Sequence, residues 1–261
     1  MGYEQTFSRN PWQIIKKTAV ELYNHMTYTA VMSVLWLITM IPVGFIAILF
    51  LTEVGNNPLG ALLQLVPITL LYCAFILGPV HCGLYYLAGQ IIEDVAQPGS
   101  LWKGLRQKYA LAAKVYVIYS FILLFTIVDF YIAFFLFSAL SMKIIGIILF
   151  YMLLFLLMMG IYLPGFIVRQ DNTVIKVFKK AVLVVLDNTI LTLVMGAIYL
   201  LFPVLACFIK FLLPLLMFGY GGFLQFAGVR TFFGILDKYP DPVNQETNLS
   251  EEDAREHLSD R

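Results

Sequence analysis

Six long, almost continuous apolar runs constrain the fold of this chain more than any other feature of its sequence. They cover approximately residues 27–51, 60–88, 112–138, 144–168, 183–208 and 211–234. A helix needs about 20 mostly apolar residues to cross the hydrocarbon core of a bilayer, and each run reaches that length. Because 61% of the residues are hydrophobic and only 13% are charged, a water-soluble globule of this size could not bury the apolar surface. The sequence therefore predicts an all-α polytopic membrane bundle with about six transmembrane helices.

Lysine and arginine lie almost entirely in the connections on one side of these predicted spans. Fifteen of the 17 fall in the N-terminal segment, the second and fourth connections and the C-terminal segment; the exceptions are Lys143 and Lys210. Because basic connections stay in the cytoplasm, we expect a multi-pass membrane protein with both termini cytoplasmic. The chain then divides into an amphipathic N-terminal helix (1–26), a domain of three helical hairpins (27–236) and an acidic flexible tail (237–261).

Each outward-going span is preceded by a basic segment with the pattern of an amphipathic helix. The three segments are NPWQIIKK, QPGSLWKGLRQK and QDNTVIKVFKK, and they open on the capping residues Asn10, Ser100 and Thr173. Such helices lie in the membrane interface, where basic residues attract anionic headgroups. The candidate surface for lipid or for a partner consists of Lys16, Lys17, Lys103, Arg106, Lys176, Lys179 and Lys180. The second and third segments align without gaps at an offset of 73 residues, which fits either true internal repeats or the ordinary composition of cytoplasmic connections.

Three polar side chains, Asp129, His81 and Gln225, are predicted to lie inside the bundle. Asp129 lies 15 residues beyond Lys114, and His81 lies 12 residues before Glu93. At 1.5 Å per residue both are roughly 20 Å from the same side of the membrane, so Asp129 and His81 could meet. Such a pair suits a proton relay or an ion or solute site. The alternatives are helix–helix hydrogen bonds and, for Asp129, an outer position in water.

Asp187 and Arg230 form a second candidate pair, close to the predicted cytoplasmic side. We expect an interhelix ion pair that joins the fifth and sixth spans; the alternatives are a ligand clamp and an Arg230 side chain that reaches the interface by itself. Proline and glycine also predict breaks, in FILGPVHCG of the second span and IYLPGF of the fourth, and MFGYGGFLQFAG makes the sixth span rich in glycine.

Sequence patterns of enzymes and metal sites are not found. The chain has no H-E-x-x-H, P-loop or G-x-S-x-G motif, and one of its three histidines, His257, lies in the tail. Cys73, Cys82 and Cys207 lie in apolar runs without metal-binding spacing, as expected of small buried hydrophobic residues. We therefore expect no enzyme activity, no cofactor, no metal site and no nucleic-acid partner.

Three motifs resemble the YesL-type family of uncharacterised bacterial integral membrane proteins. They are VLWLITMIPVG at 34–44, GPVHCGLYYLAGQI at 78–91 and SLWKGLRQKYALAAKVY at 100–116. The resemblance implies a bacterial plasma-membrane accessory protein associated with carbohydrate uptake, and it assigns no catalytic residue.

Together these observations predict a non-enzymatic membrane protein that assists or regulates solute uptake. Its basic cytoplasmic helices would face anionic lipid headgroups or a membrane transport partner. One alternative is a small secondary transporter or channel that uses Asp129, His81 and the glycine-rich sixth span; a second alternative is an intramembrane enzyme. A water-accessible cavity that reaches Asp129 would favour transport, and a dry, fully packed bundle would favour the accessory role.

Overall fold

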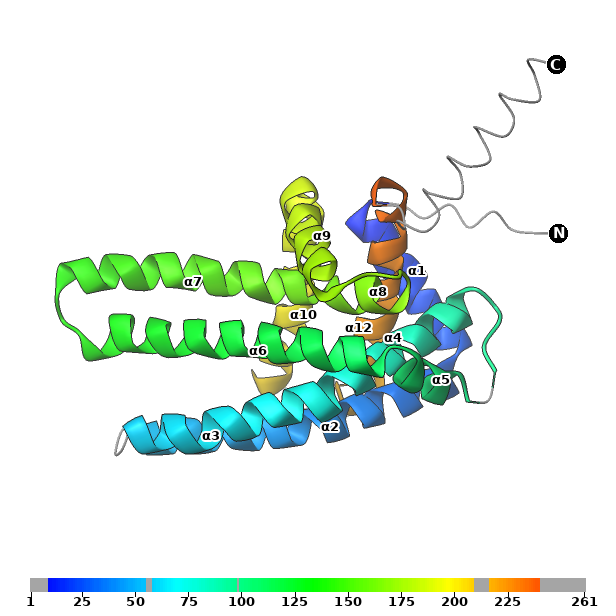
Figure 1. The fold of residues 1–261 in the computed structure, drawn as a ribbon. Coiled ribbons are helices and arrows are strands. Elements are labelled where there is room, and N and C mark those ends of the chain that lie inside the picture. The colour runs from blue at the N-terminus through cyan, green and yellow to red at the C-terminus, as the bar shows by residue number, and fades with distance from the viewer. Residues whose placement is uncertain (1–8, 55–57, 98, 209–215, 240–261) are drawn as a thin grey trace, which may run out of the picture.

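The computed structural model describes residues 9–54, 58–97, 99–208 and 216–239, and every regular element within these ranges is helical (Figure 1). The α-helices are α1 (Pro11–Asn24), α2 (Met26–Val54), α3 (Pro58–Tyr72), α4 (Gly78–Ile92), α5 (Ser100–Gln107), α6 (Tyr109–Tyr131), α7 (Leu140–Gly160), α8 (Leu163–Val168), α9 (Val174–Asp187), α10 (Thr189–Phe208) and α12 (Gly221–Phe233). Three π-helical segments cover Cys73–Leu77, Ile132–Leu136 and Leu216–Tyr220, and a 3-10 turn covers Leu236–Lys238. The predicted all-α class is confirmed.

Four helical segments among the described residues are long and apolar enough to cross a membrane. They are Met26–Phe50, Gln64–Ile92, Tyr109–Leu136 and Leu140–Gly160, and they correspond to the first four predicted spans. Between 12% and 28% of the residues in these apolar segments are buried inside the molecule, so most of their surface requires a hydrocarbon environment. The chain is therefore a membrane protein. The predicted sixth span begins outside the described residues. Residues 240–261, which are almost all of the predicted tail, also lie outside them.

The predicted fifth span, 183–208, starts too early. α9 continues to Asp187, the chain turns at Asn188, and α10 runs at 98° to α9. Val184 and Val185 belong to α9 because their side chains are buried in the hydrophobic core. α9 and α10 together could form a fifth span only if that span is bent between the two helices.

The predicted fourth span, 144–168, is divided in two. α7 ends at Gly160, and α8 begins after a two-residue gap with Pro164 in its first turn, where the ring needs no backbone hydrogen-bond donor. The IYLPGF motif therefore marks a break, as predicted. In the second span, Pro79 likewise lies in the first turn of α4, directly after the π-helical segment Cys73–Leu77.

Two of the three predicted helix caps differ in detail. Asn10 caps α1 as predicted, since its Oδ1 accepts a hydrogen bond from the backbone N–H of Trp12 at 3.0 Å. The N-cap of α5 is Gly99, which adopts φ 99°, and Ser100 is the first helical residue. Thr173 is the N-cap of α9 but makes no side-chain capping bond.

Helices α1, α5 and α9 end at one-residue joints of similar geometry, and each joint leads directly into a longer helix. The joint residues are His25 (φ −119°, ψ 43°), Lys108 (φ −122°, ψ 22°) and Asn188 (φ −120°, ψ 41°). The three basic segments identified from the sequence thus share their local architecture as well as their composition.

α1 and α9 match more closely than the two segments that the sequence aligned. Both helices have 14 residues, whereas α5 has 8, so the offset of 73 residues does not extend to the joint. At an offset of 163 residues, caps, lysines, buried positions and joints coincide: Asn10/Thr173, Ile14/Val177, Lys16/Lys179, Lys17/Lys180, Thr18/Ala181 and His25/Asn188. The first and third basic segments therefore share their length, their cap position and their joint.

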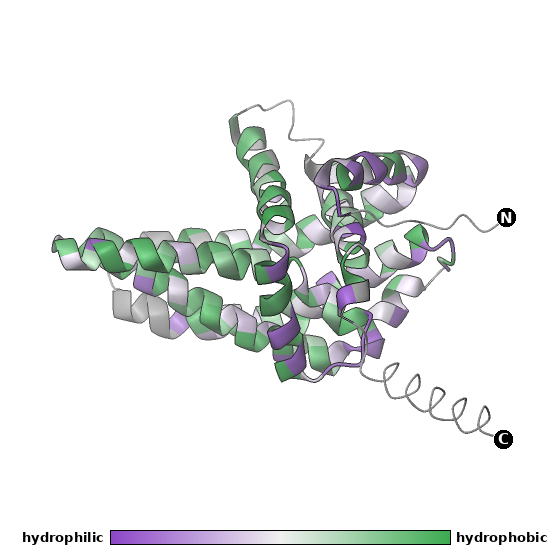
Figure 2. Cartoon of the chain, turned by 90° about the horizontal axis from the view of Figure 1, so that it is seen from above, coloured by the Kyte–Doolittle hydropathy of each residue, from purple (hydrophilic) through white to green (hydrophobic). Residues whose placement is uncertain are grey.

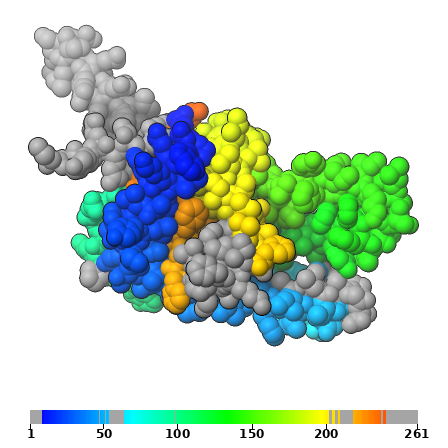
Figure 3. Space-filling model, turned by 180° about the vertical axis from the view of Figure 1, so that it is seen from behind, coloured from blue at the N-terminus to red at the C-terminus, as the bar shows by residue number. Residues whose placement is uncertain are grey.

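The α2–α3 and α6–α7 hairpins extend in the same direction, and α9 and α12 run across them (Figure 1). The two hairpins form apolar arms, whereas hydrophilic residues gather toward the opposite end of the molecule (Figure 2). The arms project beyond the rest of the chain (Figure 3). The best-packed core lies away from the arm tips, where Tyr85, Tyr162, Phe166, Phe226 and Phe232 are each less than 2% exposed.

Polar contacts tie the four predicted cytoplasmic segments together. Arg169 pairs with Glu93, and Lys108 pairs with Asp171, which joins the second and fourth connections. The Arg9 Nε donates to the Gly234 carbonyl at 3.0 Å, which joins the N-terminal and C-terminal segments. In addition, the Gln170 side chain donates to the Tyr239 backbone carbonyl at 2.5 Å, which joins the fourth connection to the C-terminal segment. All four segments therefore meet at one end of the molecule.

Candidate functional site

A cavity of about 250 Å³ lies among α2, α4, α6, α7, α10 and α12. It contains two of the three predicted polar residues, His81 and Gln225, with four tyrosines around them. No aspartate, glutamate, lysine or arginine is among its described lining residues. The lining residues are Met40, Leu77, His81, Tyr85, Tyr116, Tyr119, Leu157, Gly160, Ile161, Tyr199, Leu224, Gln225 and Gly228. The cavity is therefore uncharged at its walls but rich in hydrogen-bonding groups.

Gln225 is the most unusual side chain of the cavity. It is fully buried, and neither its Oε1 nor its Nε2 has a hydrogen-bond partner among the described residues. The Tyr199 hydroxyl is likewise buried and unpartnered. A buried polar group without a partner destabilises a protein by about 1–3 kcal/mol, so such groups call for a functional explanation. A polar molecule that reached these atoms would satisfy them.

The other polar groups of the cavity wall already have partners. The Tyr116 hydroxyl lies 3.1 Å from Nδ1 of His81. Tyr85 donates to the Gly228 carbonyl at 3.3 Å, and Tyr119 donates to the Leu156 carbonyl at 3.0 Å. These bonds fix the rings around the cavity, whereas the buried Gln225 amide and Tyr199 hydroxyl lack partners among the described residues.

Asp129 does not reach the cavity and does not meet His81. It is half-buried on α6, with no side-chain hydrogen bond or ion pair recorded among the described residues. His81 faces Tyr116, and Asp129 lies 13 residues farther along α6, about 20 Å at 1.5 Å per residue. The predicted pair fails because α4 and α6 are staggered, so equal distances from their cytoplasmic ends do not give equal depths.

The predicted ion pair between Asp187 and Arg230 is also wrong. The Arg230 guanidinium binds the Glu21 carboxylate, and these side chains are 8% and 15% exposed. His25 lies 3.5 Å from the same carboxylate. The reason is that α1 packs against α12 and brings Glu21 to the buried arginine, whereas Asp187 is exposed at the end of α9.

Asp187 accepts a hydrogen bond from the Tyr239 hydroxyl instead. Burial, reinforced by the neighbouring Asp187 carboxylate, raises the pKa of Tyr239 above its usual value, so the hydroxyl remains a donor at neutral pH. The backbone carbonyl of Tyr239 accepts from Gln170. These contacts anchor the last described residue beside α9.

Arg169 lies against α4 at Gly89, one helical turn from Tyr85 of the cavity wall. Its Nη1 donates to both Glu93 oxygens at 2.8 and 3.0 Å, and its guanidinium lies 4.9 Å from the centroid of the Phe233 ring. A Cβ at Gly89 would come within 1.8 Å of Nη2, so glycine is required for this close approach. Tyr85, Gly89 and Glu93 follow at four-residue spacing on one helical face. The sequence carried no signal for this arrangement.

Five of the seven predicted surface cations are exposed: Lys16, Lys103, Arg106, Lys176 and Lys179. Arg106 lies over the Trp102 ring at 4.8 Å. Lys17 and Lys180 are half-buried, and Lys180 donates to the Gln170 side-chain oxygen at 2.6 Å. The exposed members remain available to anionic headgroups or to a partner.

No group of three or more His, Cys, Asp or Glu side chains within the described ranges is placed to hold a metal ion. Cys73 and Cys82 are buried free thiols; the Cys207 side chain is not among those described. Comparisons with protein-family models, curated proteins and solved structures find no match to this chain. Function must therefore be argued from the geometry of the cavity.

Proposed function

We propose that the protein is a non-enzymatic component of solute uptake that holds a small, uncharged polar solute in the central cavity. The supporting observation is the fully buried Gln225 amide, whose donor and acceptor both lack a partner. A hydroxyl or amide group on the solute can donate to Oε1 and accept from Nε2. Binding would then relieve an unfavourable free energy that the unliganded protein carries.

The lining of the cavity supports an uncharged solute. A charged group would be separated from water without a counter-charge among the lining residues, which is strongly unfavourable in an apolar bundle. Tyrosine rings offer flat apolar faces with polar edges, and a volume of about 250 Å³ is slightly below the usual range for drug-sized ligands. A small polyol or monosaccharide fits, in agreement with the carbohydrate association that the YesL-type resemblance implies.

We also propose a bacterial plasma-membrane location with both termini in the cytoplasm. This proposal rests on the distribution of lysine and arginine and is supported by the joining of the four basic segments at one end. The exposed Lys103, Arg106, Lys176 and Lys179 would face anionic headgroups or a transport partner. A transporter that depends on Asp129 has less support, because Asp129 lies outside the cavity.

The variant Gln225→Met tests the proposed solute site, because it keeps the side-chain volume and removes the amide. In phosphatidylcholine nanodiscs without solute, we expect its unfolding temperature to equal or exceed that of the wild type, since an unpaired buried amide has been removed. Glycerol, xylitol and methyl glucoside should stabilise the wild type, by about 2.7 kcal/mol at 100 times Kd, and should not stabilise the variant. Thermal unfolding measures both effects.

Asp129→Asn provides the matched control, because it alters an intramembrane polar residue outside the cavity. It should respond to the three solutes as the wild type does. The proposal would be rejected if Gln225→Met unfolds several degrees below the wild type without solute, because the amide would then have a structural role. It would also be rejected if none of the solutes stabilises the wild type.

A further inference from the structure

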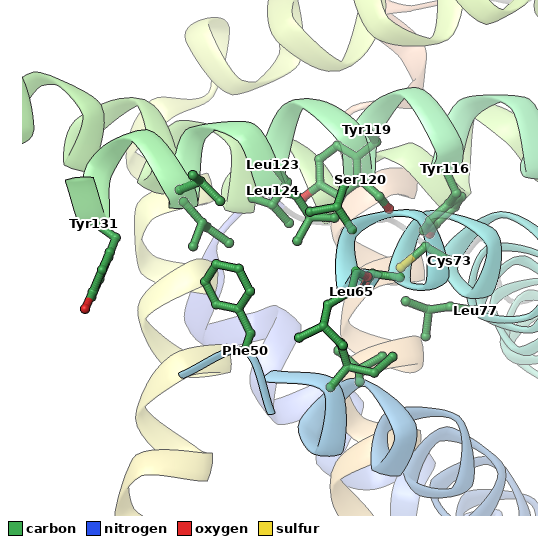
Figure 4. Close-up of a pocket in the computed structure, with 16 residues that line it drawn as sticks. Phe50, Leu65, Cys73, Leu77, Tyr116, Tyr119, Ser120, Leu123, Leu124 and Tyr131 are labelled. Carbon is green, nitrogen blue, oxygen red and sulfur yellow. Dashed lines mark hydrogen bonds between the residues drawn. The ribbon is translucent and has the colours of Figure 1, made fainter. Parts of the chain in front are cut away.

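A long apolar groove runs along α6 (Figure 4). One wall consists of α6 side chains from Tyr116 to Tyr131, and the other of residues such as Phe50 and Leu65 from α2 and α3. The groove has a volume of about 380 Å³, and none of its described lining residues is charged. Thr69, one of its few polar members, donates its hydroxyl to the Leu65 carbonyl at 2.7 Å. The groove is therefore suited to hydrocarbon.

The groove and the cavity adjoin each other. Leu77, Tyr116 and Tyr119 line both, and Figure 4 shows these tyrosines at the same end of the groove as Cys73 and Leu77. Tyr116 directs its hydroxyl to His81 of the cavity wall. The lining thus changes from apolar to hydrogen-bonding at this junction.

We propose that groove and cavity form one site for a single-chain neutral lipid. Its uncharged, hydroxyl-bearing head lies at Gln225 and Tyr199, and its hydrocarbon chain lies in the groove. This inference rests on the proposed function and narrows the solute to an amphiphile such as a monoacylglycerol.

The dimensions agree with this ligand class. From Tyr116 to Tyr131 the groove follows 15 residues of α6, about 22 Å at helical rise. The hydrocarbon core of a bilayer is about 30 Å thick, and one lipid chain crosses about half of it. A single chain therefore fits lengthwise. An anionic or zwitterionic head is disfavoured because the cavity has no charged lining residue.

Photolabelling tests the inference. A monoacylglycerol with a diazirine on its chain is added to the full-length protein in phosphatidylcholine nanodiscs, and the labelled residues are mapped by mass spectrometry. We expect labels on the groove-facing residues of α3 and α6, with competition by monoolein. Oleoyl lysophosphatidylglycerol, which has the same chain and an anionic head, should compete at least about tenfold less well.

Two variants test separately the contacts of the lipid's hydrocarbon chain and those of its head. Leu124→Trp fills the groove, and Gln225→Met removes the head contact; both should reduce groove labelling about tenfold. Ile148→Trp is the matched control, because Ile148 is 63% exposed on α7 outside the groove, and it should label as the wild type does. The competition in wild-type protein tests the proposal even if a variant fails to fold.

The outcomes distinguish this inference from the proposed function. Equal competition by the anionic lipid, with labelling unchanged by Gln225→Met, would show ordinary bilayer lipid in the groove and would overturn the inference. Stabilisation by glycerol or methyl glucoside without groove labelling would overturn the lipid ligand and leave the solute site intact. If the polar solutes do not stabilise the protein and the lipid probe does not label the groove, both proposals are overturned.

Discussion

Replacing Arg230 with methionine is expected to destabilise the protein by about 3–5 kcal/mol, because it leaves the Glu21 carboxylate buried without its partner. The Arg230 side chain is 8% exposed and that of Glu21 15% exposed, so water compensates little for the lost contact. His25, whose Nε2 lies 3.5 Å from a Glu21 carboxylate oxygen, makes a longer and weaker contact than Arg230. Denaturant or thermal unfolding in detergent measures the loss.

The double variant Glu21→Leu with Arg230→Met is the decisive comparison. Since both charges are then removed and apolar side chains occupy the site, most of the stability should return. Asp187→Asn is the second control and should have little effect, because Asp187 is exposed and binds Tyr239 rather than Arg230. A double variant as unstable as the single one would show that the ion pair is not the cause.

Gly221→Ala is expected to destabilise the contact between α2 and α12 by about 1–3 kcal/mol, the usual range for an overpacked core. A Cβ at Gly221 would lie 2.6 Å from the Ser33 Cα and 2.8 Å from the Trp36 Cβ. These atoms belong to or adjoin the α2 backbone and cannot rotate away, so the helices must separate. The separation also weakens the 2.9 Å hydrogen bond from the Gly222 N–H to the Ser33 hydroxyl. Thermal unfolding of the purified variant measures the effect.

Gly44→Ala is the matched control on α2. A Cβ at Gly44 meets nothing within 4 Å, and alanine favours a helix over glycine by about 0.5–1 kcal/mol. Gly44→Ala should therefore be neutral or slightly stabilising. If both substitutions change the unfolding temperature equally, close packing at Gly221 is not their cause.

The sequence was sufficient to predict the helical class, the membrane environment and two residues of the cavity. His81 and Gln225 could be recognised because a polar side chain within an apolar run requires a partner. Tyr199 could not, because tyrosine is common on membrane-facing surfaces and nothing in its local sequence indicates burial. The unpaired state of Gln225 follows from tertiary packing alone.

The wrong pairings share a physical cause. Sequence spacing gives the depth of a residue along its own helix but not the stagger between helices, which separated Asp129 from His81. Spacing also does not show which helix packs beside an interfacial one, so Glu21 was missed as the partner of Arg230. The extension of α9 to Asp187 depends on burial of Val184 and Val185, a long-range effect.

The Arg169 guanidinium occupies the space that a side chain at Gly89 would need. Its two hydrogen bonds to Glu93 and its contact with the Phe233 ring therefore depend on the absence of a side chain at that position. A larger residue at Gly89 would displace the guanidinium and so weaken the connection of α4 to the end of α8 and to α12.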